Sequence, residues 1–187
     1  MLLVIIFTIL CNVAFSTTRL AKREEMRDVS VYVCLERCVQ QGETVPSTLA
    51  SLVAIQQDRL AQEQDPIITE VVLEVLNVGE GGQVRVNYDL SWAQASLQLA
   101  PVTATLTALV SSYPYPPNLV QWISAATQNP DAFAAQLVSF SRSFPLFRSF
   151  QLDWEPTEGV TPELARAYAT FIGTTATILR REGLSLS

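Results

Sequence analysis

Short apolar runs alternate along the chain with longer segments whose apolar residues recur at helical spacing. Residues 29–38 (VSVYVCLERC) and 67–78 (IITEVVLEVLNV) are rich in β-branched side chains and are predicted to be strands. The segment 44–62 between them is predicted to be a helix, with Pro46 near its start. Its apolar positions are Leu49, Leu52, Val53, Ile55 and Leu60.

The same alternation continues to the end of the chain. Glycines at 79, 81 and 82 predict a turn, after which QVRVNY is expected to return as a short strand. Further strands are predicted over 102–112, 148–154 and the final LSLS, and helices near 91–100, 117–127, 130–143 and 161–182. Such alternation predicts parallel β/α units, in an open sheet or a barrel. A G-x-G-x-x-G motif and a phosphate loop are both missing, so a nucleotide-binding version has no support.

The chain opens with an apolar run, MLLVIIFTILCNVAFS, that ends in small residues. The run is shorter than the roughly 20 apolar residues that a membrane span needs. We therefore expect residues 1–16 to be a cleaved secretory signal, residues 17–28 a linker, and the protein to be secreted without stable membrane association. An uncleaved anchor or a buried strand is the alternative.

Composition narrows the possible chemistry. The 187 residues carry a formal net charge of -6 and no histidine. A Ser-His-Asp triad, a Cys-His pair and a histidine metal site are therefore excluded within this chain. The acidic balance also argues against a nucleic-acid partner, because binding phosphates requires a basic face.

Two cysteines, Cys34 and Cys38, remain after removal of a signal. On one extended strand they would lie about 13 Å apart, too far for a disulfide. A turn after Leu35 would allow them to pair in an oxidising compartment. Two buried, unpaired thiols are the equally acceptable alternative.

The most informative segment runs from Phe150 to Pro156, FQLDWEP. In a strand, Gln151, Asp153 and Glu155 would share one face, with Glu155 last at the carboxyl end, where β/α barrels place their active sites. Asp153 would lie about 6.6 Å below it along the strand. A second carboxylate in a dry site favours the protonated acid, so Glu155 is expected to be able to donate a proton near neutral pH.

FQLDWEP resembles the fourth-strand motif of glycoside hydrolase family 18, the chitinases and their relatives, D-x-x-D-x-D-x-E. The resemblance is greatest to a branch whose strand ends in D-W-E-P-T. It implies an incomplete (β/α)8 TIM barrel over residues 29–187, with about the first five strands. It also implies that Glu155 is the general acid and that Asp153 orients the substrate's N-acetyl group. In this family the acetamido oxygen attacks the anomeric carbon, so no metal or organic cofactor is implied.

The sequence departs from this family at three places. Arg148 and Gln151 stand where the motif has its first two aspartates, although Gln151 can still hydrogen-bond Asp153. The S-x-G-G pattern of the third strand is missing, since Ser111 and Ser112 run directly into Tyr113. Two of the four acids of the family's motif are therefore replaced in this chain.

Aromatic residues after strands are candidates for stacking on a sugar. With Gln151, we assign Tyr113 and Tyr115 to substrate binding, and Trp92 is a further candidate; ordinary loop aromatics are the alternative. Trp154 is expected to pack against the helices, since it faces away from Glu155. Glu158 is expected to be a surface charge.

Length and motif together leave several hypotheses open. A complete barrel needs about 250 residues, so the sequence is a fragment, a truncated protein or a smaller β/α fold. The first hypothesis is a secreted chitinase-like glycosidase that cleaves β-1,4-linked N-acetylglucosamine polymers, inactive as this chain alone. The alternatives are a non-catalytic carbohydrate-binding protein and a domain without sugar affinity. The oligomeric state stays open.

Overall fold

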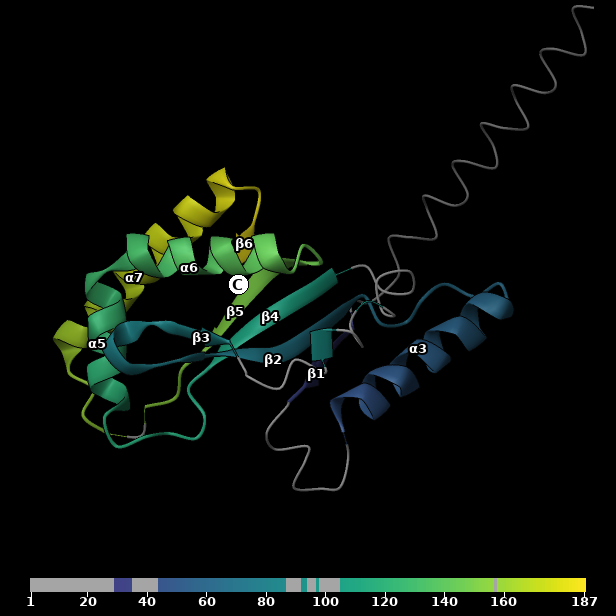
Figure 1. The fold of residues 1–187 in the computed structure, drawn as a ribbon, viewed down its shortest axis with the longest axis horizontal. Coiled ribbons are helices and arrows are strands. Elements are labelled where there is room, and N and C mark those ends of the chain that lie inside the picture. The colour runs from purple at the N-terminus through teal and green to yellow at the C-terminus, as the bar shows by residue number, and fades with distance from the viewer. Residues whose placement is uncertain (1–28, 35–43, 87–91, 94–96, 98–104, 157) are drawn as a thin grey trace, which may run out of the picture.

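The computed structural model describes residues 29–34, 44–86, 92–93, 97, 105–156 and 158–187 (Figure 1). The predicted signal and linker, Cys38 and most of the predicted helix 91–100 lie outside these ranges. The signal, the linker and the pairing of Cys34 with Cys38 therefore stay predictions.

The described strands form one sheet whose order is β1-β2-β4-β5-β6, with every neighbouring pair on this path parallel. β3 lies beside β2 and runs antiparallel to it, as the glycine turn predicted. The strand bounds are β1 Ser30–Val33, β2 Glu70–Val78, β3 Val84–Val86, β4 Thr105–Ser111, β5 Phe147–Asp153 and β6 Ser185–Leu186. The predicted α/β class with a parallel sheet is confirmed. The sheet does not close into a barrel within the described residues.

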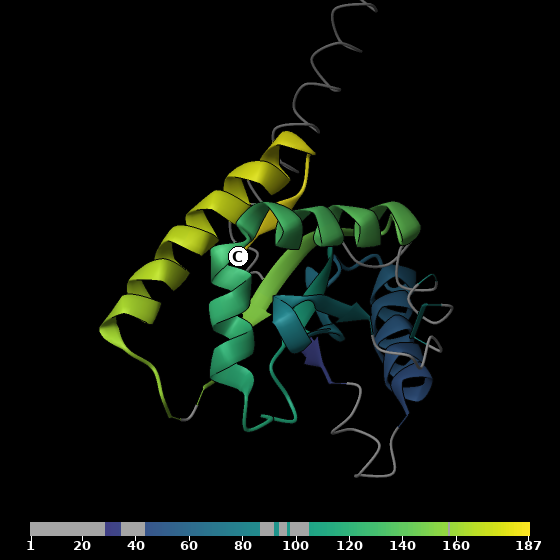
Figure 2. The ribbon, with the colours of Figure 1, turned by 60° about the vertical axis from the view of Figure 1, so that its left-hand side comes forward.

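Helices cover one face of this sheet. Their bounds are α3 Val45–Ala61, α5 Leu119–Gln128, α6 Pro130–Ser143 and α7 Pro162–Arg181. Figures 1 and 2 show α5, α6 and α7 grouped together, while α3 lies apart from them beside β1 and β2. The core between sheet and helices is apolar and includes Val71 and Leu73 of β2, Ala108 of β4 and Phe150 of β5. The opposite face of the sheet carries the alternate residues.

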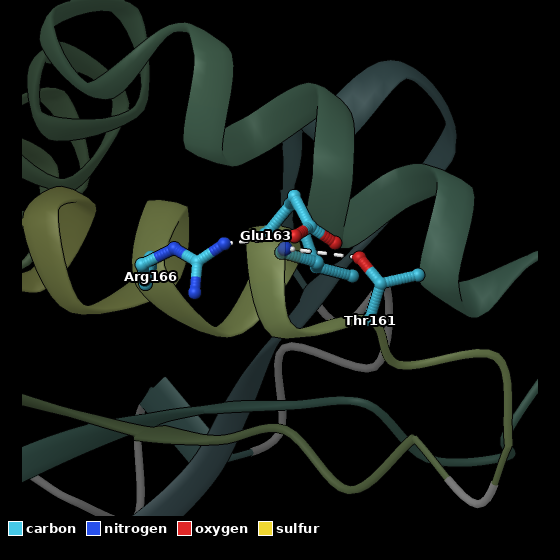
Figure 3. A network of polar contacts seen from close by, with 4 residues as sticks. Thr161, Glu163 and Arg166 are labelled. Atoms are coloured by element: carbon cyan, nitrogen blue, oxygen red, sulfur yellow. Dashed lines mark hydrogen bonds and ion pairs between the residues drawn. The ribbon is translucent and has the colours of Figure 1, made fainter.

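Local sequence explains where the helices begin. Thr44 caps α3 by accepting a hydrogen bond from the backbone N–H of Ser47 (3.2 Å). At α7, the Thr161 hydroxyl caps the helix by accepting from the backbone N–H of Leu164 (3.2 Å), as Figure 3 shows. Figure 3 also shows Glu163 paired with Arg166 at 2.8 Å; both side chains are exposed, so the pair adds little stability.

The hairpin between β2 and β3 reaches past the carboxyl end of β2 and contacts α5 (Figure 1). Its turn is a short 3-10 segment, Glu80–Gly82, in which Gly82 adopts a left-handed φ of 73°. Gly82 lies against the backbone of Ala126. The backbone N–H of Val84 donates to Gln136 Oε1 of α6 (2.9 Å). The hairpin is thereby attached to both helices that follow β4.

Candidate active site

The carboxyl ends of β4 and β5 lie side by side, because Ser111 pairs with Asp153 in the parallel register. Beyond this pair, the backbone N–H of Ser112 donates to the carbonyl oxygen of Asp153 (3.1 Å). The Ser112 hydroxyl donates to the same carbonyl (3.2 Å) and accepts from the backbone N–H of Glu155 (3.0 Å). Ser112 therefore fixes the backbone that carries both motif carboxylates.

The structure corrects one prediction about Glu155. β5 ends at Asp153, so Glu155 lies two residues beyond the strand, and its side chain is exposed. The dry environment expected for this carboxylate is therefore wrong. Glu155 still lies at the carboxyl edge of the sheet, as predicted, because Ser112 at the end of β4 holds its backbone.

The loop after β4 brings Tyr115 to Glu155. The Tyr115 hydroxyl donates to Glu155 Oε2 at 2.7 Å, and the Tyr115 N–H donates to the carbonyl of Ser112 at 2.9 Å. Tyr115 has a left-handed φ of 58°, a conformation that costs an L-residue about 1–2 kcal/mol. Non-glycine residues in this region occur preferentially at functional sites. The ring of Tyr113 meets that of Tyr115 edge-on, with centroids 5.7 Å apart.

Gln151 contacts a residue that the sequence reasoning missed. The hydroxyl of Tyr32, on β1, lies 3.1 Å from Gln151 Oε1 and 3.0 Å from Gln151 Nε2. This contact spans β2 and β4 on the face of the sheet opposite the helix-covered core. Alternation along 29–38 places Tyr32 on the face opposite Val31 and Val33, and this is the signal that would have found it.

The same face carries a second polar cluster near the amino ends of the strands. Glu70 of β2 accepts hydrogen bonds from the hydroxyls of Ser30 (2.6 Å) and Thr107 (2.5 Å). Glu70 therefore links three neighbouring strands. Glu70 was not among the site residues predicted from the sequence, although a charged residue within the apolar run 67–78 is a usable signal.

The aromatic residues divide between site and core. Trp154 packs against Phe133, Tyr168 and Phe171, so its predicted core role is confirmed. Trp92 is fully buried against Phe144 and other rings, so its suggested place on a sugar-binding rim is wrong. A residue that follows a predicted strand can turn inward as easily as outward, and the sequence does not tell which.

The side chain of Asp153 is half-buried, and its charge affects the pKa of Tyr168 on α7. The pKa of Tyr168 is raised above its ordinary value, mainly because the hydroxyl is buried and also because the Asp153 carboxylate is negative. Tyr168 thus stays neutral beside Asp153. Arg148 lies toward the other end of β5, where its guanidinium donates to the carbonyl of Gly183 (3.1 Å), and it takes no part in this cluster.

These contacts define what the site can do. It offers two carboxylates, a phenolic hydroxyl directed at one of them, and two tyrosine rings at the carboxyl edge of a parallel β/α sheet. The described part of the chain holds no cluster of three or more metal-ligating His, Cys, Asp or Glu residues. None of its helices has the length and apolar character needed to span a membrane. The exposed acid lies at the carboxyl edge of parallel strands, the end at which β/α barrels place their active sites.

The fold is an α/β fold with a parallel sheet, and comparison with solved structures shows which known proteins it resembles. The chain is similar to a chitinase from Chromobacterium violaceum (TM-score 0.58, 16% identity, 86% of this chain and 44% of that chain). It is also similar to a GH18 chitinase from Flavobacterium johnsoniae (TM-score 0.57, 11% identity, 85% of this chain and 44% of that chain). A third similar structure is catalytic domain 2 of the Ostrinia furnacalis group II chitinase, solved in complex with an N-acetylglucosamine oligomer (TM-score 0.58, 14% identity, 87% of this chain and 43% of that chain).

At these identities the likeness establishes a shared fold. The chain spans less than half of the length of these chitinases. The predicted structural resemblance to part of the glycoside hydrolase family 18 barrel is confirmed. No protein-family model and no curated protein sequence matches the chain.

Proposed function

We propose that this protein is a secreted, chitinase-like glycoside hydrolase that acts on β-1,4-linked N-acetylglucosamine polymers. The observation that carries the proposal is the D-W-E segment placed at the carboxyl edge of a chitinase-like sheet, with Glu155 held there by Ser112 and Tyr115. Secretion is supported by the signal-like residues 1–16.

In the proposed reaction, Glu155 gives its proton to the glycosidic oxygen as the bond from that oxygen to the anomeric carbon breaks. The acetamido oxygen of the same sugar forms the new bond to the anomeric carbon, as the family resemblance implies. Water then opens this cyclic intermediate and returns a proton to Glu155. Asp153 orients the acetamido group, while Tyr113 and Tyr115 are the proposed aromatic contacts, and Gln151 a polar one.

The test replaces Glu155 with Gln, which preserves shape but removes the proton donor. A positioned general acid contributes about 10²- to 10⁴-fold to rate, so chito-oligomer hydrolysis by the full-length protein should fall by at least about 100-fold. Glu158→Gln is the matched control, because Glu158 is exposed in the loop that follows β5. Hydrolysis at the parent rate in Glu155→Gln rules out the acid assignment. Oligomer binding without turnover in the wild type would identify a non-catalytic carbohydrate-binding protein.

A further inference from the structure

The hydrogen bond between Tyr115 and Glu155 distinguishes the two oxygens of the carboxyl group. Oε2 accepts the Tyr115 hydroxyl at 2.7 Å, within the range of hydrogen bonds to a carboxylate. Oε1 accepts no hydrogen bond from any residue that the structure describes. The two oxygens are therefore not equivalent in this site.

This difference has a consequence once the carboxyl group takes up a proton. A protonated carboxyl has one hydroxyl oxygen that donates and one carbonyl oxygen that accepts. An oxygen already accepting from a phenol is the better carbonyl oxygen, so the proton resides on the other. We propose that Tyr115 is a positioning residue that assigns the acidic proton to Glu155 Oε1 and turns this oxygen toward the sugar. The inference rests on the proposed function.

The loop geometry allows Tyr115 to hold this position. Its backbone is in a left-handed conformation and its N–H is bonded to the carbonyl of Ser112, the residue that also holds the backbone of Glu155. The ring of Tyr113 packs edge-on against the ring of Tyr115. The backbones of Tyr115 and Glu155 are thus both bonded to Ser112 at the end of β4. This shared attachment holds the Tyr115 hydroxyl in the geometry needed for its hydrogen bond to Glu155.

The test uses Tyr115→Phe in the full-length protein, with Glu158→Gln as the control, because Glu158 is exposed in the loop after β5 and has no proposed role in the site. Phenylalanine keeps the ring and loses only the hydroxyl. Two substrates separate positioning of a proton from general damage: a chito-oligomer, whose sugar leaving group needs a proton, and an aryl glycoside, whose phenolate leaving group needs little. We expect kcat for the oligomer to fall about tenfold, the effect of one hydrogen bond, with KM unchanged and aryl glycoside cleavage nearly unaffected.

Each other result overturns the inference in a recognisable way. Equal loss on both substrates indicates a structural role for Tyr115. No loss on either substrate shows that the hydroxyl does not position the proton, even though Glu155 is the acid. A second measurement compares the chito-oligomer affinity of Glu155→Ala with that of the double variant Glu155→Ala, Tyr115→Phe. The two affinities should be equal, because the Tyr115 hydroxyl has no carboxyl group to position once Glu155 is removed. A wild-type protein that neither cleaves nor binds oligomers refutes the proposed function itself, and the inference with it.

Discussion

Replacing Gly82 with alanine tests how the β2–β3 hairpin is attached to the helices around the site. A Cβ atom at Gly82 would lie 2.2 Å from the backbone N of Ala126 and 2.6 Å from its Cα. Both neighbours are main-chain atoms of α5, so they cannot move aside by a side-chain rotation. Either the hairpin or the helix must shift.

Gly81→Ala provides the control, because Gly81 has the same left-handed backbone conformation as Gly82 but does not contact α5. Its φ is 67°, close to the 73° of Gly82, and a Cβ at Gly81 meets nothing within 4 Å. Both alanine variants carry the left-handed penalty of about 1–2 kcal/mol, partly offset by about 0.4–1 kcal/mol from a stiffer unfolded chain. Only Gly82→Ala adds overpacking, typically about 1–3 kcal/mol. That range is the expected difference between the two variants.

Urea denaturation followed by tryptophan fluorescence measures this difference as a change in the free energy of unfolding. Equal destabilisation by Gly81→Ala and Gly82→Ala would show that the hairpin does not press on α5. Because α5 follows the loop that carries Tyr115, a shifted hairpin should also weaken chito-oligomer binding in Gly82→Ala. Gly81→Ala should bind as the wild type does.

Two further predictions concern residues that support the site. Gln56 of α3 is buried, and its side chain donates to the carbonyl of Ile68 (2.8 Å) and accepts from the N–H of Ile68 (3.3 Å). Gln56→Leu should therefore lower the free energy of unfolding by about 2–4 kcal/mol, whereas Gln57→Leu, at an exposed position, should lower it by less than about 0.5 kcal/mol. Equal losses for the two variants in urea denaturation would contradict this prediction. Folding raises the pKa of Tyr168 above its ordinary value of 10.0. The stability that the neutral phenol contributes to the fold is therefore complete below pH 10 and is lost as the pH rises through the raised pKa. Above pH 10, the midpoint temperature of thermal unfolding should therefore fall less steeply with pH in Tyr168→Phe than in the wild type. An equal slope in the two proteins would show that folding does not raise the pKa of Tyr168.

Element types were accessible from the sequence because they depend on local patterns. The alternation of apolar runs predicted β2, β4, β5 and helices α3, α5, α6 and α7 close to their observed bounds. The predicted start of the helix at 161–182 was also close, since Thr161 caps α7, Pro162 is its first residue, and capping involves only neighbouring residues. The D-W-E segment was equally local, and the alternation of strands and helices placed it near the carboxyl edge of the sheet, although β5 ends two residues before Glu155.

Contacts between distant segments followed only from the folded arrangement. Tyr32 reaches Gln151 across two intervening strands, and Tyr115 reaches Glu155 across 40 positions of sequence. The exposure of Glu155 and the burial of Trp92 depend on where the chain leaves the sheet, which no periodicity encodes. Patterns along a chain report the neighbours of each residue in sequence, whereas burial and hydrogen-bond partners depend on neighbours in space.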